Sequence, residues 1–261
     1  MRKLKLVLLP LLAVVAYMFS GSVLLRLGVD SIVSTLVVDL VVFGLCFVYL
    51  RGKPASVRGD GTSVTHARSK YLFWFALALV WLFGQITASW VLSATGDAAF
   101  TAYNETLHDT SGIMTAMSLL LTLVAAPLCE EYLIRGVVFG TWSKLNPWFA
   151  FFGSALLFSL LHGTVTHLLP TFMMGLLMAA AYASTGKLWF SALLHMGYNA
   201  GAAVLGGAAV PSLFFEPWVF FTADALLIAL AVLEYRHAMA VSNGKAVSDG
   251  ETTEEVAEVD G

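Results

Sequence analysis

The sequence predicts an all-α, polytopic membrane protein with about eight transmembrane helices, and three observations support this class. Of the 261 residues, 59% are hydrophobic and only 12% are charged. Soluble domains have about 45–50% apolar and about 25% charged residues. Apolar stretches close to the ~20 residues that a membrane-spanning helix requires recur along the chain. This much apolar surface exceeds what one core can bury, so most of it is expected to face lipid.

Eight apolar stretches are candidate membrane-spanning helices. They cover residues 6–27, 31–50, 71–94, 113–143, 148–163, 169–185, 188–208 and 211–233. The first has basic residues before its apolar run, as a signal peptide does, but the run continues to Leu27, which favours a retained helix. The fourth is apolar over 113–129 and is then broken by charges.

The distribution of basic residues predicts the orientation. Lys and Arg accumulate in cytoplasmic loops. With the N-terminus inside, every Lys and Arg except Arg26 and Arg135 falls on the cytoplasmic side, and the outer loop 95–112 contains neither residue type. We therefore expect a multi-pass protein of the cell (inner or plasma) membrane with both termini in the cytoplasm.

Three regions follow from this pattern. Residues 1–111 hold the first three helices and their loops, 112–235 form a helix bundle that carries the polar motifs, and 236–261 form an acidic cytoplasmic tail that is expected to be disordered. With 14 Lys and Arg against 17 Asp and Glu, the chain has no basic surface for nucleic acid. Its two cysteines allow neither a disulfide framework nor a thiolate zinc cluster.

Polar groups within the apolar stretches mark the candidate site, because an ionisable side chain at membrane depth is costly and is a functional hypothesis by default. Glu131 and Arg135 are four residues apart and are expected to pair on one helix face, while Glu130 lies about 100° away and is free to face a cavity. The next stretch places Phe158 and His162 on one face. The seventh does the same with His195 and Asn199.

These residue types are the parts of a hydrolytic site. A buried carboxylate beside an imidazole can deprotonate a water molecule, as a general base does. A second imidazole and an amide can donate hydrogen bonds to an oxyanion that develops on a carbonyl. The zinc, serine and aspartyl motifs of known intramembrane proteases do not occur in the sequence.

The motifs Glu-Glu-x-x-x-Arg, Phe-x-x-x-His and His-x-x-x-Asn, in this order over about 112–205, resemble those of the CAAX-protease and bacteriocin-processing (CPBP) family. That family includes the type II CAAX prenyl endopeptidase and lysostaphin-resistance-like proteins. The resemblance implies an eight-helix bundle with the active site inside it, and an intramembrane endopeptidase acting on a membrane-embedded or membrane-anchored protein or peptide. Its site residues would be catalytic Glu130, His162, His195 and Asn199, with Glu131, Arg135 and Phe158 in support.

Three alternatives stay open at this point. A zinc-dependent version of the same protease would use Glu130, His162 and His195 as ligands. We favour a metal-free site without a cofactor, because Glu131 is expected to be committed to Arg135 and no other carboxylate is placed to orient the imidazoles. The other two alternatives are a non-catalytic membrane scaffold and a proton-coupled transporter.

Overall fold

The fold was analysed in a computed structural model. It describes residues 2–51, 112–162, 165–205, 218–219, 221–222, 224–236 and 238–240. Every regular element in these ranges is a helix, which confirms the predicted all-α class. The predicted span at 71–94, the loops on both sides of it and residues 241–261 of the tail lie outside the described residues.

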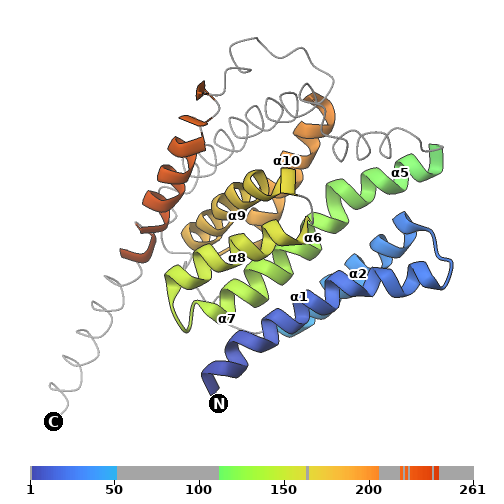
Figure 1. The fold of residues 1–261 in the computed structure, drawn as a ribbon, viewed down its shortest axis with the longest axis horizontal. Helices are drawn as coiled ribbons and strands as arrows, with labels where there is room; N and C mark the ends of the chain where they lie inside the picture. Colours follow the sequence, from blue (N-terminus) through green and yellow to red (C-terminus); the bar gives the residue numbers. More distant parts are fainter. Residues whose placement is uncertain are drawn as a thin grey trace, which may run out of the picture.

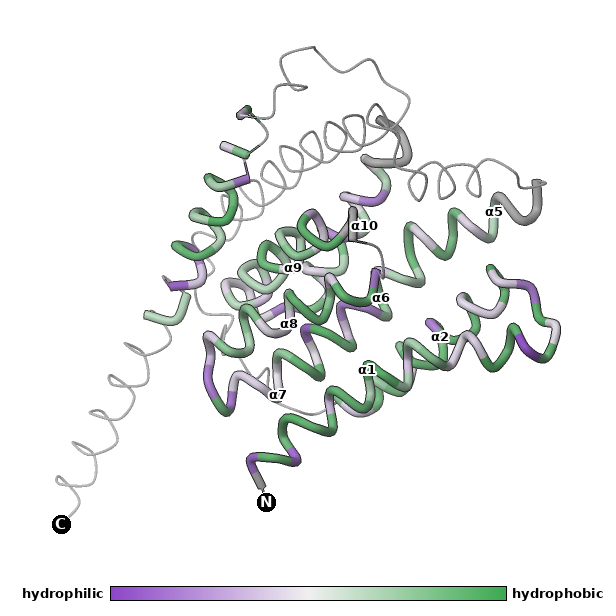
Figure 2. Tube along the Cα trace, in the orientation of Figure 1, coloured by the Kyte–Doolittle hydropathy of each residue, from purple (hydrophilic) through white to green (hydrophobic). Residues whose placement is uncertain are grey.

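The N-terminal part is a hairpin of two helices that lie side by side (Figure 1), α1 (Arg2–Arg26) and α2 (Ser31–Leu50). The turn between them contains Gly28 at a φ of 81°, a conformation that a residue without Cβ adopts easily. Asp30 then caps α2 by accepting hydrogen bonds from the backbone N–H groups of Ile32 and Val33. Figure 2 shows both helices apolar along most of their length, as lipid-facing helices are.

The next helix is continuous from Gly112 to Trp142, in agreement with the predicted span at 113–143. It consists of α5 (Gly112–Leu120), a π-helical segment η2 (Leu121–Ala125), α6 (Ala126–Glu131), a second π-helical segment η3 (Tyr132–Phe139) and α7 (Gly140–Trp142). The charged residues therefore lie inside one long helix. π-Helical turns inside α-helices are frequent at functional sites.

The remaining helices enclose the charged part of this long helix. They are α8 (Pro147–Leu161), α9 (Val165–Thr185) and α10 (Leu188–Leu205). α8 packs closely along α9, because Gly175 lets the two backbones approach. A Cβ atom at Gly175 would come within 2.9 Å of the Ala155 Cα. A further helical segment covers 224–236, and its Tyr235 donates a hydrogen bond to the Pro147 carbonyl at 2.7 Å.

Four helices among the described residues are long and apolar enough to cross a membrane: Lys3–Arg26, Ser31–Leu50, Ala116–Trp142 and Leu168–Thr185. α8, with 15 residues, is apolar but shorter. These helices agree with a polytopic membrane protein. The total of eight membrane-spanning helices stays a prediction.

Candidate active site

The candidate site contains a fully buried ion pair. Arg135 Nη1 lies 3.1 Å from Glu131 Oε1, and neither side chain is exposed, so the pair expected from their spacing is present. The other guanidinium branch donates from Nη2 to the Gly175 carbonyl on α9 at 3.0 Å. The guanidinium carbon also lies 4.5 Å from the centre of the Phe158 ring on α8. One arginine thus links η3 to both α8 and α9.

Glu131 has more partners than the sequence predicts. Besides Arg135, its Oε1 faces His195 Nδ1 at 3.2 Å, and its Oε2 accepts a hydrogen bond from Ser191 Oγ at 2.5 Å. The expectation that Glu131 is committed to Arg135 alone is therefore wrong. Because this carboxylate accepts, His195 Nδ1 donates the hydrogen bond and Nε2 is left to face the other way. Glu131 thus orients the imidazole on α10.

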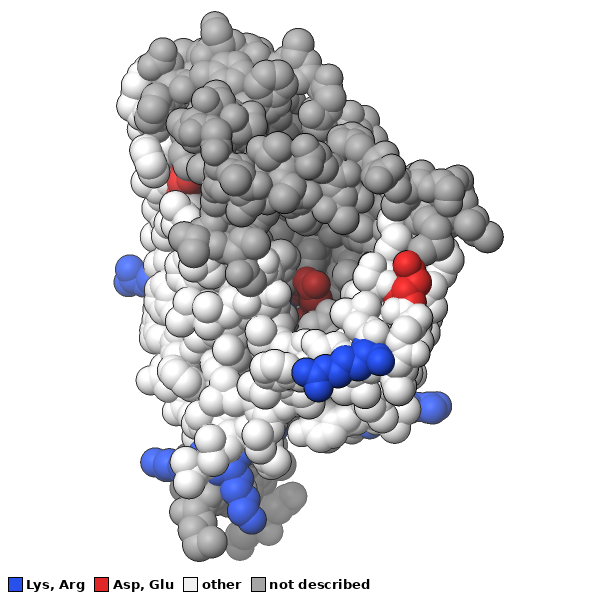
Figure 3. Space-filling view, turned by 45° about the vertical axis from the view of Figure 1, so that its right-hand side comes forward, with Lys and Arg blue, Asp and Glu red and all other residues white. Residues whose placement is uncertain are grey.

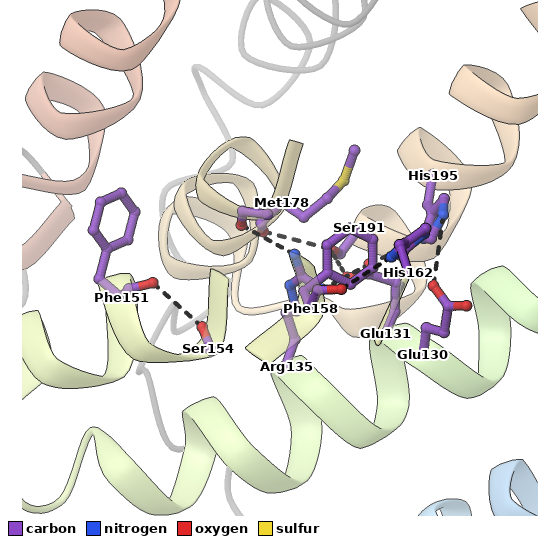
Figure 4. A network of polar contacts seen from close by, with 11 residues as sticks. Glu130, Glu131, Arg135, Phe151, Ser154, Phe158, His162, Met178, Ser191 and His195 are labelled. Carbon is purple, nitrogen blue, oxygen red and sulfur yellow. Dashed lines mark hydrogen bonds and ion pairs between the residues drawn. The ribbon is translucent and has the colours of Figure 1, made fainter. Parts of the chain in front are cut away.

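Glu130 lies on the Nε2 side of His195, as Figure 4 shows. Its Oε2 is 3.9 Å from His195 Nε2, and its side chain keeps 14% exposure. Oε2 is itself buried and has no hydrogen-bond partner among the described residues, so its capacity to accept a hydrogen bond is not used within them. In the space-filling view of Figure 3, acidic atoms lie at the floor of a recess.

His162, at the end of α8, is oriented by the backbone. Its Nδ1 lies 3.0 Å from the Phe158 carbonyl, and a carbonyl can only accept, so Nδ1 carries the proton and Nε2 is the free nitrogen. The Phe158 ring centre lies 4.9 Å from the His162 ring and 5.5 Å from the His195 ring. Phe158 therefore packs against His195 as well as against His162, its neighbour on the same helix face.

Asn199 satisfies a backbone group that the helix itself cannot. In η2 the Ala126 N–H donates to the Leu121 carbonyl, so it no longer serves Thr122. The next donor along the helix would be residue 127, but Pro127 has no N–H. The Thr122 carbonyl accepts instead from Asn199 Nδ2 on α10 at 2.8 Å. The amide thus links α10 to the π-helical segment at Thr122, about two helical turns before Glu130.

This arrangement predicts the effect of Asn199→Ala on stability. Without the amide the Thr122 carbonyl has no donor, and we expect a loss of about 1–3 kcal/mol in the free energy of unfolding. In a Pro127→Ala background, residue 127 supplies a backbone N–H. There, Asn199→Ala should lower the free energy of unfolding by less than it does in the wild type. Thermal unfolding in detergent measures both. Equal losses in the presence and absence of Pro127 would contradict the assignment.

The zinc alternative is not matched by the positions of the side chains. Among the described residues, no three or more His, Cys, Asp or Glu side chains are close enough together to hold a metal ion. The argument that no carboxylate orients an imidazole no longer stands, because Glu131 orients His195. The two findings point in opposite directions, and we derive no step through a metal.

Six of the seven motif residues come together, from the long helix, α8 and α10. The seventh, Asn199, binds the Thr122 carbonyl, eight residues before Glu130 on the long helix. The main residue that the sequence analysis missed is Ser191. It precedes His195 by four residues, so Ser191, His195 and Asn199 follow one face of α10. This spacing could have indicated it.

An all-α membrane protein with a buried carboxylate–imidazole cluster is the class that this fold and site define. Comparison with known proteins agrees. Residues 112–201 match the family model described as type II CAAX prenyl endopeptidase Rce1-like. A Bacillus subtilis (strain 168) protein named "Putative membrane peptidase YdiL" is 28% identical over 90 residues, which are 34% of this chain and 37% of that protein. No solved structure matches.

The predicted relationship to the CPBP family is thus confirmed over residues 112–201, the part of the chain that contains all three motifs. The matched segment begins at the first residue of α5 and ends within α10. The chain aligns with little more than a third of the length of its Bacillus relative. The division at residues 111/112 and the separate tail stay predictions.

Proposed function

We propose that the protein is an intramembrane endopeptidase that hydrolyses a peptide bond of a membrane-associated protein or peptide. The observation that carries this proposal is the Glu130 carboxylate: its Oε2 has no hydrogen-bond partner among the described residues and lies 3.9 Å from His195 Nε2 of an oriented imidazole. A carboxylate held in this way has the position of a general base.

The proposed reaction divides the roles between the motifs. Glu130, together with His162, takes a proton from a water molecule that attacks the scissile carbonyl, and then returns the proton to the leaving amine. Asn199 donates a hydrogen bond to the oxygen of the tetrahedral intermediate, and His195 donates a second through Nε2 when it is an imidazolium, because its Nδ1–H is already bonded to Glu131. Asn199 has a second amide hydrogen for this purpose, because its bond to Thr122 uses only one.

The substrate proposed is a membrane-embedded or membrane-anchored polypeptide, because Glu130 lies within a helix that is apolar enough to span the bilayer. A prenylated CAAX protein is one member of this class, suggested by the description of the matching family. A cleavage assay with purified protein in lipid nanodiscs tests the activity. In H₂¹⁸O, the new carboxyl terminus of a membrane-anchored peptide should gain one ¹⁸O atom, read by mass spectrometry.

We expect catalysis without a metal ion. Exhaustive chelation should leave the rate unchanged, with the metal content measured in the same sample. Added zinc should inhibit, because it would occupy Glu130 and His162. Activity that is lost on chelation and restored by stoichiometric zinc would make Glu130, His162 and His195 ligands.

The proposed location is the cell membrane with both termini in the cytoplasm. Reporters fused after Lys245 or within 51–70 should report the cytoplasmic side, and reporters within 97–110 the outer side. Two reporter enzymes, one active only in the cytoplasm and one active only outside it, measure the orientation at each fusion site. An outer reading at 51–70 would overturn the orientation and the eight-helix count together.

A further inference from the structure

A second buried carboxyl group lies outside the matched segment, on the N-terminal hairpin. Asp39 is fully buried on α2, and its Oδ1 accepts a hydrogen bond from the Tyr17 hydroxyl of α1 at 2.8 Å. Its Oδ2 accepts no hydrogen bond from the described part of the chain, and no Lys or Arg there pairs with it. A buried acid without a cation is costly, so its position requires a reason.

Asp39 faces the helix that carries the proposed base. α2 packs against α6 and η3, and the Cys129 thiol, one residue before Glu130, lies next to the Asp39 carboxyl group. Glu130 is the next residue of the same helix, α6, on which α2 packs. Glu130 therefore has an acid on its α2 side and an imidazole, His195, on its α10 side.

We propose that Asp39, held by Tyr17, is a positioning residue that directs the Glu130 carboxylate towards the histidines. This inference rests on the proposed peptidase function. Like charges repel more strongly in a low-dielectric interior than in water, so a carboxylate on α2 disfavours Glu130 conformations that turn away from His195. The Tyr17 hydroxyl donates to Asp39 Oδ1 and so fixes the direction of this carboxyl group.

This role adds a function for the hairpin that lies outside the matched region. The three motifs supply the base, the imidazoles and the amide. The hairpin supplies the charge that limits the side-chain conformations of Glu130. Asp39 does not need to touch the substrate. Its loss should therefore lower kcat and leave KM unchanged, as expected for a group that acts on the chemical step alone.

The test compares Asp39→Asn and Tyr17→Phe with Ser34→Ala. Ser34 is a matched control, since it is buried on the same helix and its hydroxyl binds the Gly21 carbonyl at 3.0 Å, within the hairpin. We expect Asp39→Asn to lower kcat per folded protein by about 10- to 10²-fold, the scale for a displaced catalytic group. Tyr17→Phe should have a smaller effect in the same direction, and Ser34→Ala none.

The outcomes separate this inference from the proposed function. A wild-type protein without hydrolytic activity would refute the peptidase. A wild-type protein that is active, and inactive as Glu130→Gln, with normal kcat per folded protein in Asp39→Asn and Tyr17→Phe, would refute the positioning role alone. If Asp39→Asn does not fold, Tyr17→Phe decides, because it removes only one hydroxyl oxygen.

Discussion

Glu130→Gln is expected to lower the rate of hydrolysis by at least ~10²-fold, the scale for loss of a general base. Glutamine has nearly the same shape as glutamate but cannot take a proton from water. Glu130 makes no hydrogen bond through Oε2 in the described structure, and glutamine fills the same volume, so folding should be preserved. Initial rates with purified wild type and variant, at equal amounts of folded protein, measure the effect.

Glu234→Gln is the matched control. Glu234 accepts a hydrogen bond from Ser184 at 2.9 Å, which a glutamine oxygen can also accept, and it belongs to none of the three motifs. Its activity should equal that of the wild type. Full activity in Glu130→Gln would remove Glu130 from the role of base.

Arg135→Met should have the largest effect on stability. It leaves the Glu131 carboxylate buried without its cation, which costs about 3–5 kcal/mol for pairs of this kind. It also removes the donor to the Gly175 carbonyl and the contact with the Phe158 ring, both between helices. We expect a large drop in the melting temperature in detergent, with loss of activity.

The double variant Glu131→Gln/Arg135→Met separates stability from catalysis. Removing both charges should recover much of the stability, because no buried ion is left unpaired. Activity should stay low, since a neutral glutamine holds His195 Nδ1 more weakly than a carboxylate does. A single Arg135→Met variant as stable as the wild type would show that the pair is not needed for folding.

The sequence predicted the helical class, the motif residues and the Glu131–Arg135 pair, because helical spacing alone determines which side chains share a face. The second helix was placed at 31–50, the residues that α2 covers. The end of the fifth helix is predicted less accurately. The apolar pattern extends it to residue 163, whereas α8 ends at Leu161 and His162 is its C-cap.

Contacts between helices were beyond such reasoning. Glu131 binds His195 across 64 positions of sequence, and Asn199 binds Thr122 across 77. Spacing within one helix gives no information about either. The sequence also did not predict the π-helical segments. Their hydrogen bonds depend on the whole long helix, so a single residue such as Pro127 does not indicate them.

The short α8 has a consequence for the surrounding bilayer. Its 15 residues span ~22 Å, against a hydrocarbon thickness of ~30 Å. His162, at its end, therefore lies below one membrane surface unless the lipids deform. Hydrophobic mismatch of this kind thins the bilayer locally or admits solvent beside the helix end. The lipid composition around α8 thus determines how far water must travel to reach the Glu130 carboxylate. Membrane thickness therefore affects the supply of water to the site.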